Sequence, residues 1–184
     1  NGKEILRKNF EKEVILQYDF ELWSPENPKL YDFEITTASG DKVQSYFGVR
    51  SFGQTKDKNG IARLTLNGKP YFFNGVLDQG YWSDGMLTYP SDRAAIDELT
   101  MLKDMGFNTV RKHIKIEPEI FYYECDRLGM AVFQDMVNNG DYSFLRDTAL
   151  PTVGLKKLSD RYLHRNTATR QAFMRAMEET VAQL

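Results

Sequence analysis

The chain has 184 residues, of which 41% are hydrophobic and 27% charged, so it can build an ordinary globular core. Its formal net charge is −2 and the basic residues are spread along the sequence, which gives no footprint for nucleic acid. No apolar run approaches the roughly 20 residues that span a bilayer, so no membrane partner is expected.

Cysteine and histidine are scarce. Cys125 is the only cysteine, which excludes an internal disulfide, and the two histidines stand well apart from it. The spacing of these three residues does not match that of a metal site, so we expect neither a metal nor another cofactor. Cys125 also lies among apolar residues at helical spacing, which favours a small core residue over a nucleophile. Residues 1–10 are polar and charged, show no signal peptide, and look like the middle of a longer chain.

Residues 13–47 alternate between apolar and polar side chains with a period close to two. This pattern predicts antiparallel strands over residues 14–21, 30–35 and 43–49, joined by ordinary turns. A complete immunoglobulin-like sandwich takes about 100 residues and about seven strands. We therefore interpret residues 1–53 as the C-terminal part of such a β-sandwich, with its beginning absent.

A second domain is assigned to residues 54–184. Its first residues, 54–60, are polar and are expected to form a connector. Residues 61–66 and 70–73 then flank Asn67-Gly68, the strongest short signal for a β-hairpin. This hairpin would lead directly into the first strand of an α/β domain.

Three short apolar runs alternate with two amphipathic helical stretches between Tyr71 and Asp135. This alternation predicts βαβ units and a parallel sheet. The first helix would begin after an N-cap at Ser91 and stop at Gly106. The second would have Pro118 near its first position and would end at Gly129.

Polar residues follow each of the three apolar runs. They are Asp78 and Gln79, Arg111 and His113, and Gln134 and Asp135. In parallel α/β folds the chemistry lies at the carboxyl ends of the strands. We therefore expect Asp78, Arg111 and Asp135 to line one wall of a pocket.

After Asp135 the chain becomes polar and loop-like as far as residue 165, and a last helix is expected from Asn166 or Thr167. A group of basic residues near the end of this stretch is interpreted as a solvated face in preference to a binding patch. Its members are Arg161, His164, Arg165 and Arg170.

Five segments of the chain stand in a characteristic order and spacing. They are Leu22–Tyr31 (LWSPENPKLY), Phe47–Phe52 (FGVRSF), Leu66–Val76 (LNGKPYFFNGV), Met101–Arg111 (MLKDMGFNTVR) and Cys125–Asp135 (CDRLGMAVFQD). Together they resemble glycoside hydrolase family 2, the family of β-galactosidases, β-glucuronidases and β-mannosidases. The resemblance implies an α/β fold in which a partial (β/α)8 TIM barrel, its first three βα units, follows the end of an immunoglobulin-like sandwich.

The resemblance also implies retaining hydrolysis of terminal β-glycosidic bonds in carbohydrates, with a β-galactosidase-like enzyme as the first expectation. The family's two catalytic glutamates follow its fourth and seventh barrel strands, and this sequence ends before both, so no catalytic residue is assigned. A retaining glycosidase needs two carboxyl groups about 5–5.5 Å apart. We therefore expect this polypeptide by itself to be inactive.

Substrate-binding residues follow from the same resemblance. Arg111 matches the family's arginine beside the nucleophile, where a fixed cation would keep that carboxylate ionised. Asp78, Gln79 and Trp82 stand in the loop where the family places sugar-binding residues, although this loop lacks the histidines of well-known β-galactosidases. A structural ion pair for Arg111 and simple packing of the aromatic side chain of Trp82 on the barrel rim are the competing interpretations.

His113 and Asp135 complete the predicted substrate-binding set. His113 stands one residue before the position where the family often has a histidine, so a structural role is an equal alternative. Asp135 ends the third strand where the family often has an acidic residue, and helix capping is its alternative role.

Other functions remain open at this stage. A non-catalytic carbohydrate-binding module is the main alternative, and an aldolase or metal-dependent hydrolase is less favoured, because only Lys112 and Lys115 lie near the strand ends. Open sheet edges also predict that the isolated chain covers the edge of its third strand, either with another copy in a homo-oligomer or with its own long loop. The compartment stays unknown, with periplasm or secretion favoured over cytoplasm.

Overall fold

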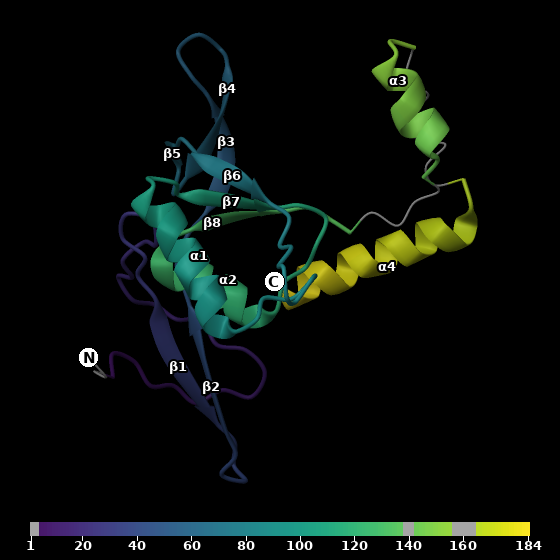
Figure 1. Cartoon of the computed structure of the whole chain (residues 1–184). Helices are drawn as coiled ribbons and strands as arrows, with labels where there is room; N and C mark the ends of the chain where they lie inside the picture. Colours follow the sequence, from purple (N-terminus) through teal and green to yellow (C-terminus); the bar gives the residue numbers. More distant parts are fainter. Residues whose placement is uncertain (1–3, 138–141, 156–164) are drawn as a thin grey trace.

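A computed structural model describes residues 4–137, 142–155 and 165–184 (Figure 1). The strands in these residues are β1 (Tyr31–Thr36), β2 (Lys42–Phe47), β3 (Phe52–Lys56), β4 (Ala62–Leu66), β5 (Lys69–Pro70), β6 (Gly75–Asp78), β7 (Thr109–Lys112) and β8 (Ala131–Gln134). The helices are α1 (Asp92–Asp104), α2 (Glu119–Leu128), α3 (Leu150–Thr152) and α4 (Thr167–Gln183), and a π-helical turn, η1 (Leu145–Ala149), runs into α3. Mixed strands and helices confirm the α/β class.

The N-terminal part contains one antiparallel hairpin, in which β1 pairs with β2 from Tyr31–Phe47 to Thr36–Lys42. The strand expected over residues 14–21 is not formed, so that prediction was wrong. Alternating side chains are not sufficient for a strand, because each strand also needs a hydrogen-bonding neighbour. The nearest pairing is an isolated bridge between Leu22 and Val49.

A second antiparallel sheet has the order β3-β4-β5. The predicted connector over residues 54–60 was wrong, because Phe52–Lys56 is strand β3. The Asp57 carboxylate accepts hydrogen bonds from the backbone amides of Asn59 and Ile61 and so builds a turn between β3 and β4. The expected domain boundary between residues 53 and 54 therefore falls inside a strand.

The hairpin predicted at Asn67-Gly68 is confirmed between β4 and β5. Both residues have positive φ, 53° and 76°, as a two-residue turn of this kind requires.

The parallel sheet β6-β7-β8 is also confirmed, with α1 and α2 as its crossover helices. The side chain of Ser91 caps α1 by accepting a hydrogen bond from the amide of Ala94. Pro118 stands at the N-cap of α2, and Gly129 ends that helix in the left-handed conformation.

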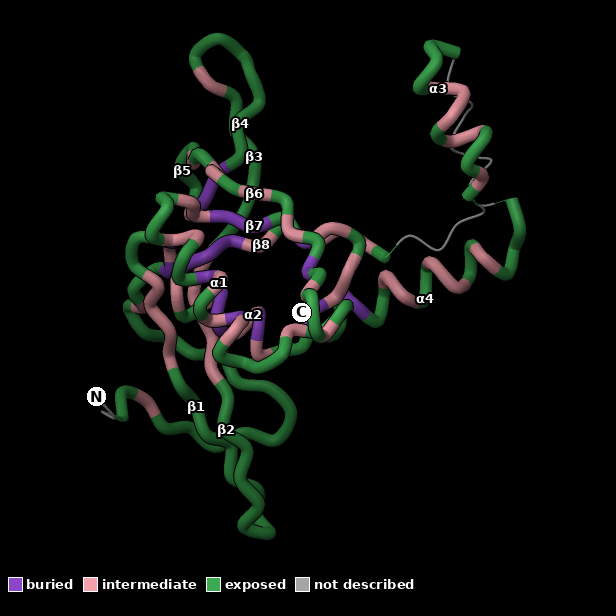
Figure 2. Tube along the Cα trace, viewed as in Figure 1, coloured by how far each residue is buried: buried purple, intermediate pink, exposed green. Residues whose placement is uncertain are grey.

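The hydrophobic core lies between this sheet and the two helices (Figure 2). Its fully buried members are Ala95, Leu99, Val110, Phe121, Cys125 and Met130. Cys125 is therefore a core residue, as its helical spacing indicates.

The two faces of the parallel sheet differ. Successive side chains of a strand point to opposite faces. Val110 and Lys112 point toward the helices and are almost fully buried. Leu77, Arg111 and Phe133 occupy one register row and are exposed on the other side, which we call the open face.

The segment around Trp23 fastens the N-terminal part to the helices. The Trp23 indole N–H donates to the backbone oxygen of Asp126 at 2.8 Å, and its own backbone oxygen accepts from Asn67 at 2.9 Å. The Lys103 ammonium donates to the backbone oxygens of Pro25 and Gly129. Since Trp23 is only 1% exposed, this contact is an extension of the core.

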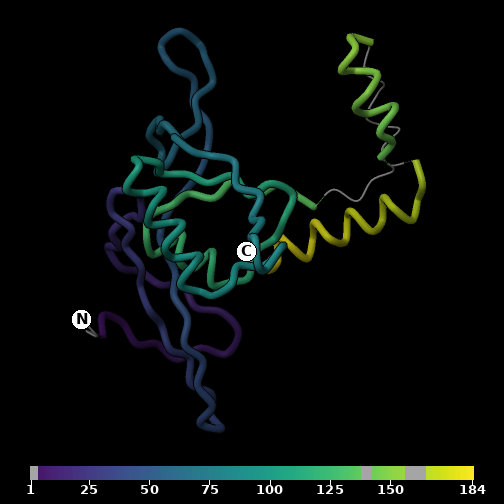
Figure 3. The backbone as a smooth tube through the Cα atoms, viewed as in Figure 1, coloured from purple at the N-terminus to yellow at the C-terminus, as the bar shows by residue number. Residues whose placement is uncertain are grey.

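The C-terminal helix α4 extends away from the sheet, and only its end comes back to the body of the molecule (Figures 1 and 3). Asn166 caps it by accepting from the amide of Ala168. None of the helices in the described ranges is both long and apolar enough to cross a membrane.

Candidate functional site

Arg111 and Asp135 join strands β7 and β8 at the open face. Arg111 Nε donates to Asp135 Oδ1 and Arg111 Nη2 donates to Asp135 Oδ2, both at 2.9 Å. These hydrogen bonds, together with the positive charge of Arg111, lower the pKa of Asp135 below its ordinary value. The carboxylate is therefore ionised at neutral pH and oriented by a planar, two-pronged partner. We call these two residues the rim pair.

The loop that follows β7 contributes to the same site. Residues 113–116, which we call the exit arch, lie between Lys112 and Glu117. The backbone amide of Ile114 and the nearby His113 both contribute to lowering the pKa of Asp135. Ile114 has a φ of 48°, which is uncommon for any residue except glycine and strained for a β-branched one. Such outliers gather at functional sites, where the surrounding structure holds them.

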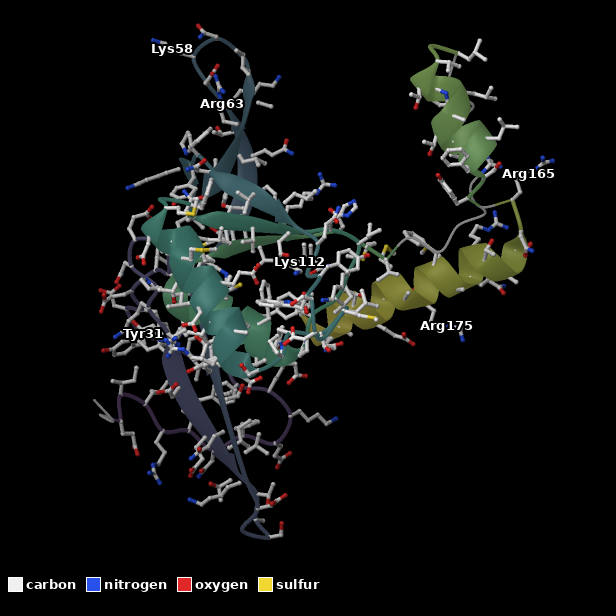
Figure 4. The ribbon with its side chains drawn as sticks, viewed as in Figure 1. Tyr31, Lys58, Arg63, Lys112, Arg165 and Arg175 are labelled. Atoms are coloured by element: carbon white, nitrogen blue, oxygen red, sulfur yellow. The ribbon has the colours of Figure 1, made fainter. Side chains whose placement is uncertain are left out.

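A buried group of four charges lies on the helix side of the sheet, directly behind the exit arch. Lys112 Nζ contacts Asp78 Oδ2 and Glu117 Oε1, both at 2.6 Å, and Lys115 Nζ lies 2.9 Å from Glu117 Oε1. Lys112 is 1% exposed and lies over the ring of Phe121 on α2 (Lys112 is labelled in Figure 4). We call Asp78, Lys112, Lys115 and Glu117 the ion cluster.

Asp78 therefore does not share a wall with Arg111 and Asp135, and that expectation was wrong. Asp78 is the register partner of Lys112, the residue after Arg111, so its side chain points to the opposite face from the rim pair. Its Oδ1 accepts from the amide of Gly80 and its Oδ2 binds Lys112. The carboxylate is engaged by the fold.

Gln79 and His113 meet at a hollow of about 470 Å³ at the carboxyl ends of β6 and β7. The remaining lining residues are Tyr81, Leu87, Ile114, Lys115, Ile116 and Val137. Trp82 is not among them. Its backbone pairs with that of Met86 in a small turn, and its side chain is half-buried. The hollow thus combines apolar side chains with an amide, an imidazole, a phenol hydroxyl and an ammonium group.

A larger hollow, about 730 Å³, lies beside α2 and the N-terminal hairpin. Trp23, Tyr46 and Tyr123 line it, and two of its charged groups, Arg50 and Asp126, form an ion pair at 2.7 Å. None of the predicted substrate-binding residues lines it, so we do not assign the site to this hollow. The rim pair lines neither hollow.

Sequence reasoning missed Lys112 and Glu117 as parts of the site. The signal was present, because Lys112 follows Arg111 in a buried strand and must point to the helix side. Gln134 belongs to the same side, where it accepts from the Tyr122 hydroxyl at 2.6 Å.

No group of three or more His, Cys, Asp or Glu side chains suited to a metal ion occurs in the described ranges. In the predicted basic group, Arg161 and His164 lie outside the described residues, whereas Arg165 and Arg170 are exposed.

Comparison with known proteins shows what the chain is similar to. Residues 2–50 match the family model for glycosyl hydrolases family 2. The exo-β-D-glucosaminidase of Amycolatopsis orientalis is 36% identical over 104 residues, which cover 54% of this chain and 10% of that protein. A putative β-glucuronidase of Formosa agariphila is 32% identical over 126 residues, covering 62% and 11%.

The resemblance to glycoside hydrolase family 2 is confirmed. Among solved structures of the family, the β-galacturonidase of Eisenbergiella tayi bound to galacturonate has a TM-score of 0.57 and 25% identity, covering 67% of this chain and 21% of that one. The chain spans about a tenth of the length of the curated relatives reported above. These relatives are named for glucosamine and uronic acid glycosides, so they give no specific support to the expected β-galactosidase activity.

Proposed function

We propose that this chain forms one wall of the sugar-binding pocket of a retaining family 2 β-glycosidase. Strands β6 to β8 would be the first three strands of a (β/α)8 barrel, and the strands before them the end of an immunoglobulin-like sandwich. The rim pair carries the proposal, because it places a fixed guanidinium–carboxylate unit at the carboxyl ends of parallel strands, where barrel enzymes hold their substrates.

The chemistry of this wall suits a sugar. Gln79 and His113 offer a donor and an acceptor each for hydroxyl groups, and the Asp135 carboxylate is a strong acceptor. Tyr81, which is 69% exposed beside the hollow, offers a flat face for the C–H groups of a pyranose ring. Trp82 stands next to it in the same loop and remains a candidate for the same role.

This wall does not itself supply the two carboxyl groups of the reaction. One of them must be protonated to release the leaving group. Arg111 lowers the pKa of Asp135, and Asp78 is ion-paired with Lys112 behind the sheet. Asp135 is therefore ionised at neutral pH, and Asp78 lies on the other side of the sheet, so neither is placed to act as the general acid. We infer that the 184-residue chain binds sugar weakly and does not hydrolyse it.

The test is hydrolysis by the product of the complete reading frame that encodes these residues. Nitrophenyl β-glucuronide, β-galacturonide, β-glucosaminide, β-galactoside and β-mannoside are compared. We expect cleavage of at least one of them by that product and none by the 184-residue chain alone. Cleavage by the chain alone would overturn the assignment of its carboxylates.

Two variants connect the rim pair to that activity. Asp135→Asn should lower kcat/KM by about 100-fold, a typical effect of losing one preorganised polar contact. Arg93→Met is the matched control, because it removes another exposed arginine–aspartate pair, with Asp97 on α1, remote in sequence from the rim. If both variants behave alike, the rim pair is not part of the pocket.

A non-catalytic carbohydrate-binding module is the alternative. It predicts that the complete product binds the same sugars, measured by calorimetry, and cleaves none of them.

A further inference from the structure

The ion cluster ties together three segments that surround the pocket. Asp78 ends β6, Lys112 ends β7, and Glu117 precedes α2. Besides its contact with Glu117, Lys115 donates to the backbone oxygen of Gly80 at 2.8 Å, so the turn after β6 is fastened as well. Each of these contacts joins residues at the ends of the strands or in the loops that follow them.

The cluster has no room to rearrange. The side chains of Lys112 and Glu117 are 1% and 2% exposed. Gly80 lies directly over them, since a Cβ added there would lie 2.5 Å from Glu117 Oε1 and 2.6 Å from Lys115 Nζ. Glu98 of α1 faces the cluster electrostatically, and burial, together with the charge of Asp78, raises its pKa. The cluster is therefore a rigid anchor and not a mobile surface network.

The ion cluster holds the two ends of the exit arch together. Lys112 and Glu117 flank it and are bonded to each other at 2.6 Å, so both of its ends are fixed on the helix side. Its top carries the strained Ile114. At its start, the backbone oxygen of Lys112 accepts a hydrogen bond from the amide of Asp135 at 3.1 Å. The arch thus connects the buried charges to the rim pair across the edge of the sheet.

We propose that Lys112 is a positioning residue, which holds the exit arch in its strained conformation through Asp78 and Glu117 and thereby places Ile114 and His113 beside Asp135. The inference rests on the proposed function, because it concerns side chains of the same pocket. Its test needs no substrate, so a failure of this inference can be distinguished from a failure of the proposed function.

The experiment uses NMR on the full chain. The exchange rate of the Ile114 amide and the titration of the Asp135 carboxyl carbon are measured in Lys112→Met and in a control, Lys103→Met. Lys103 is a fitting control because it also donates two hydrogen bonds from a partly buried site, but to Pro25 and Gly129, away from the arch.

We expect Lys112→Met to speed Ile114 exchange at least tenfold and to move the Asp135 titration midpoint upward toward its ordinary value. Lys103→Met should change neither. If Lys112→Met does not fold, Glu117→Gln decides, because it keeps the shape of the side chain and removes its charge. Unchanged Ile114 and Asp135 signals in the folded variant, or equal changes in the control, would overturn the proposal.

Discussion

Gly129 lies against the backbone of Pro25, so closely that a Cβ added to Gly129 would stand 2.5 Å from the Pro25 oxygen. Gly129 ends α2, and Pro25 belongs to the N-terminal part, so the glycine is one of the places where the two parts of the molecule touch. The contact is made by backbone atoms, which cannot turn aside as a side chain can.

A pair of glycine variants measures this contact. Gly106 follows α1 with a φ of 89° and has open space around it, whereas Gly129 has a φ of 77° and the Pro25 contact. Gly106→Ala should lower the free energy of unfolding by about 1 kcal/mol, through backbone strain alone. Gly129→Ala should cost about 2 kcal/mol more, because the Pro25 segment must move. Urea denaturation compares them, and equal losses would show that the parts do not pack as described.

The rim pair predicts a pH dependence of stability. The pKa of Asp135 is lower in the folded chain than in the unfolded one, so its ionised form favours folding. This contribution is present above the unfolded pKa and is lost as the pH falls through the folded pKa. The stability difference between the natural chain and Asp135→Asn should therefore be constant at neutral pH and shrink in acid, below the ordinary value of 3.8. It should be small, because Arg111 is 56% exposed. A difference that grows in acid would contradict this sign.

The thiol of Cys125 should be unreactive toward alkylating reagents in the folded chain. It is 1% exposed, and burial raises the pKa of its thiol well above the ordinary value, which disfavours the reactive thiolate. Iodoacetamide should label it at least 100-fold more slowly in buffer than in denaturant, as followed by mass spectrometry. Rapid labelling under native conditions would mean that the core around α2 opens readily.

Self-association of the isolated chain remains a prediction. In the described ranges β6 and β8 each pair on one side only, and Leu77 and Phe133 are exposed on the open face. We expect sedimentation velocity to show concentration-dependent association of the 184-residue chain. Phe133→Lys should weaken it, whereas Val153→Lys, at an exposed residue remote from the sheet, should not. A monomer at all concentrations would refute the prediction.

The parallel sheet could be predicted because its signals are local. Ser91, Gly106 and Gly129 mark the helix ends, and the short apolar runs between them leave little choice of strand position. The hairpin at Asn67-Gly68 was found for the same reason. A second Asn-Gly pair, Asn59-Gly60, marks the turn between β3 and β4. It was missed because polar residues around it were interpreted as a connector.

Which side chains of neighbouring strands share a face could not be predicted from the sequence. Asp78 and Arg111 both stand near the ends of parallel strands, yet their side chains point to opposite faces. Only the register between β6 and β7 decides this, and the register depends on tertiary pairing. Residues 14–21 failed for a related reason, since their alternation has no strand beside it to pair with.

Two adjacent cations in β7 lie on opposite faces of the sheet, Arg111 on the solvent side and Lys112 in the interior. The strand therefore does not tolerate a shift in register by one residue. Deleting one residue just before Arg111 would move each of these two cations to the opposite face. An ammonium group would then stand opposite Asp135, where it cannot reproduce the two parallel bonds of a guanidinium. The guanidinium would take the place of Val110 in the hydrophobic core, and His113 would take the place of Lys112 between Asp78 and Glu117. The Arg111-Lys112 pair is therefore compatible with only one register of this strand.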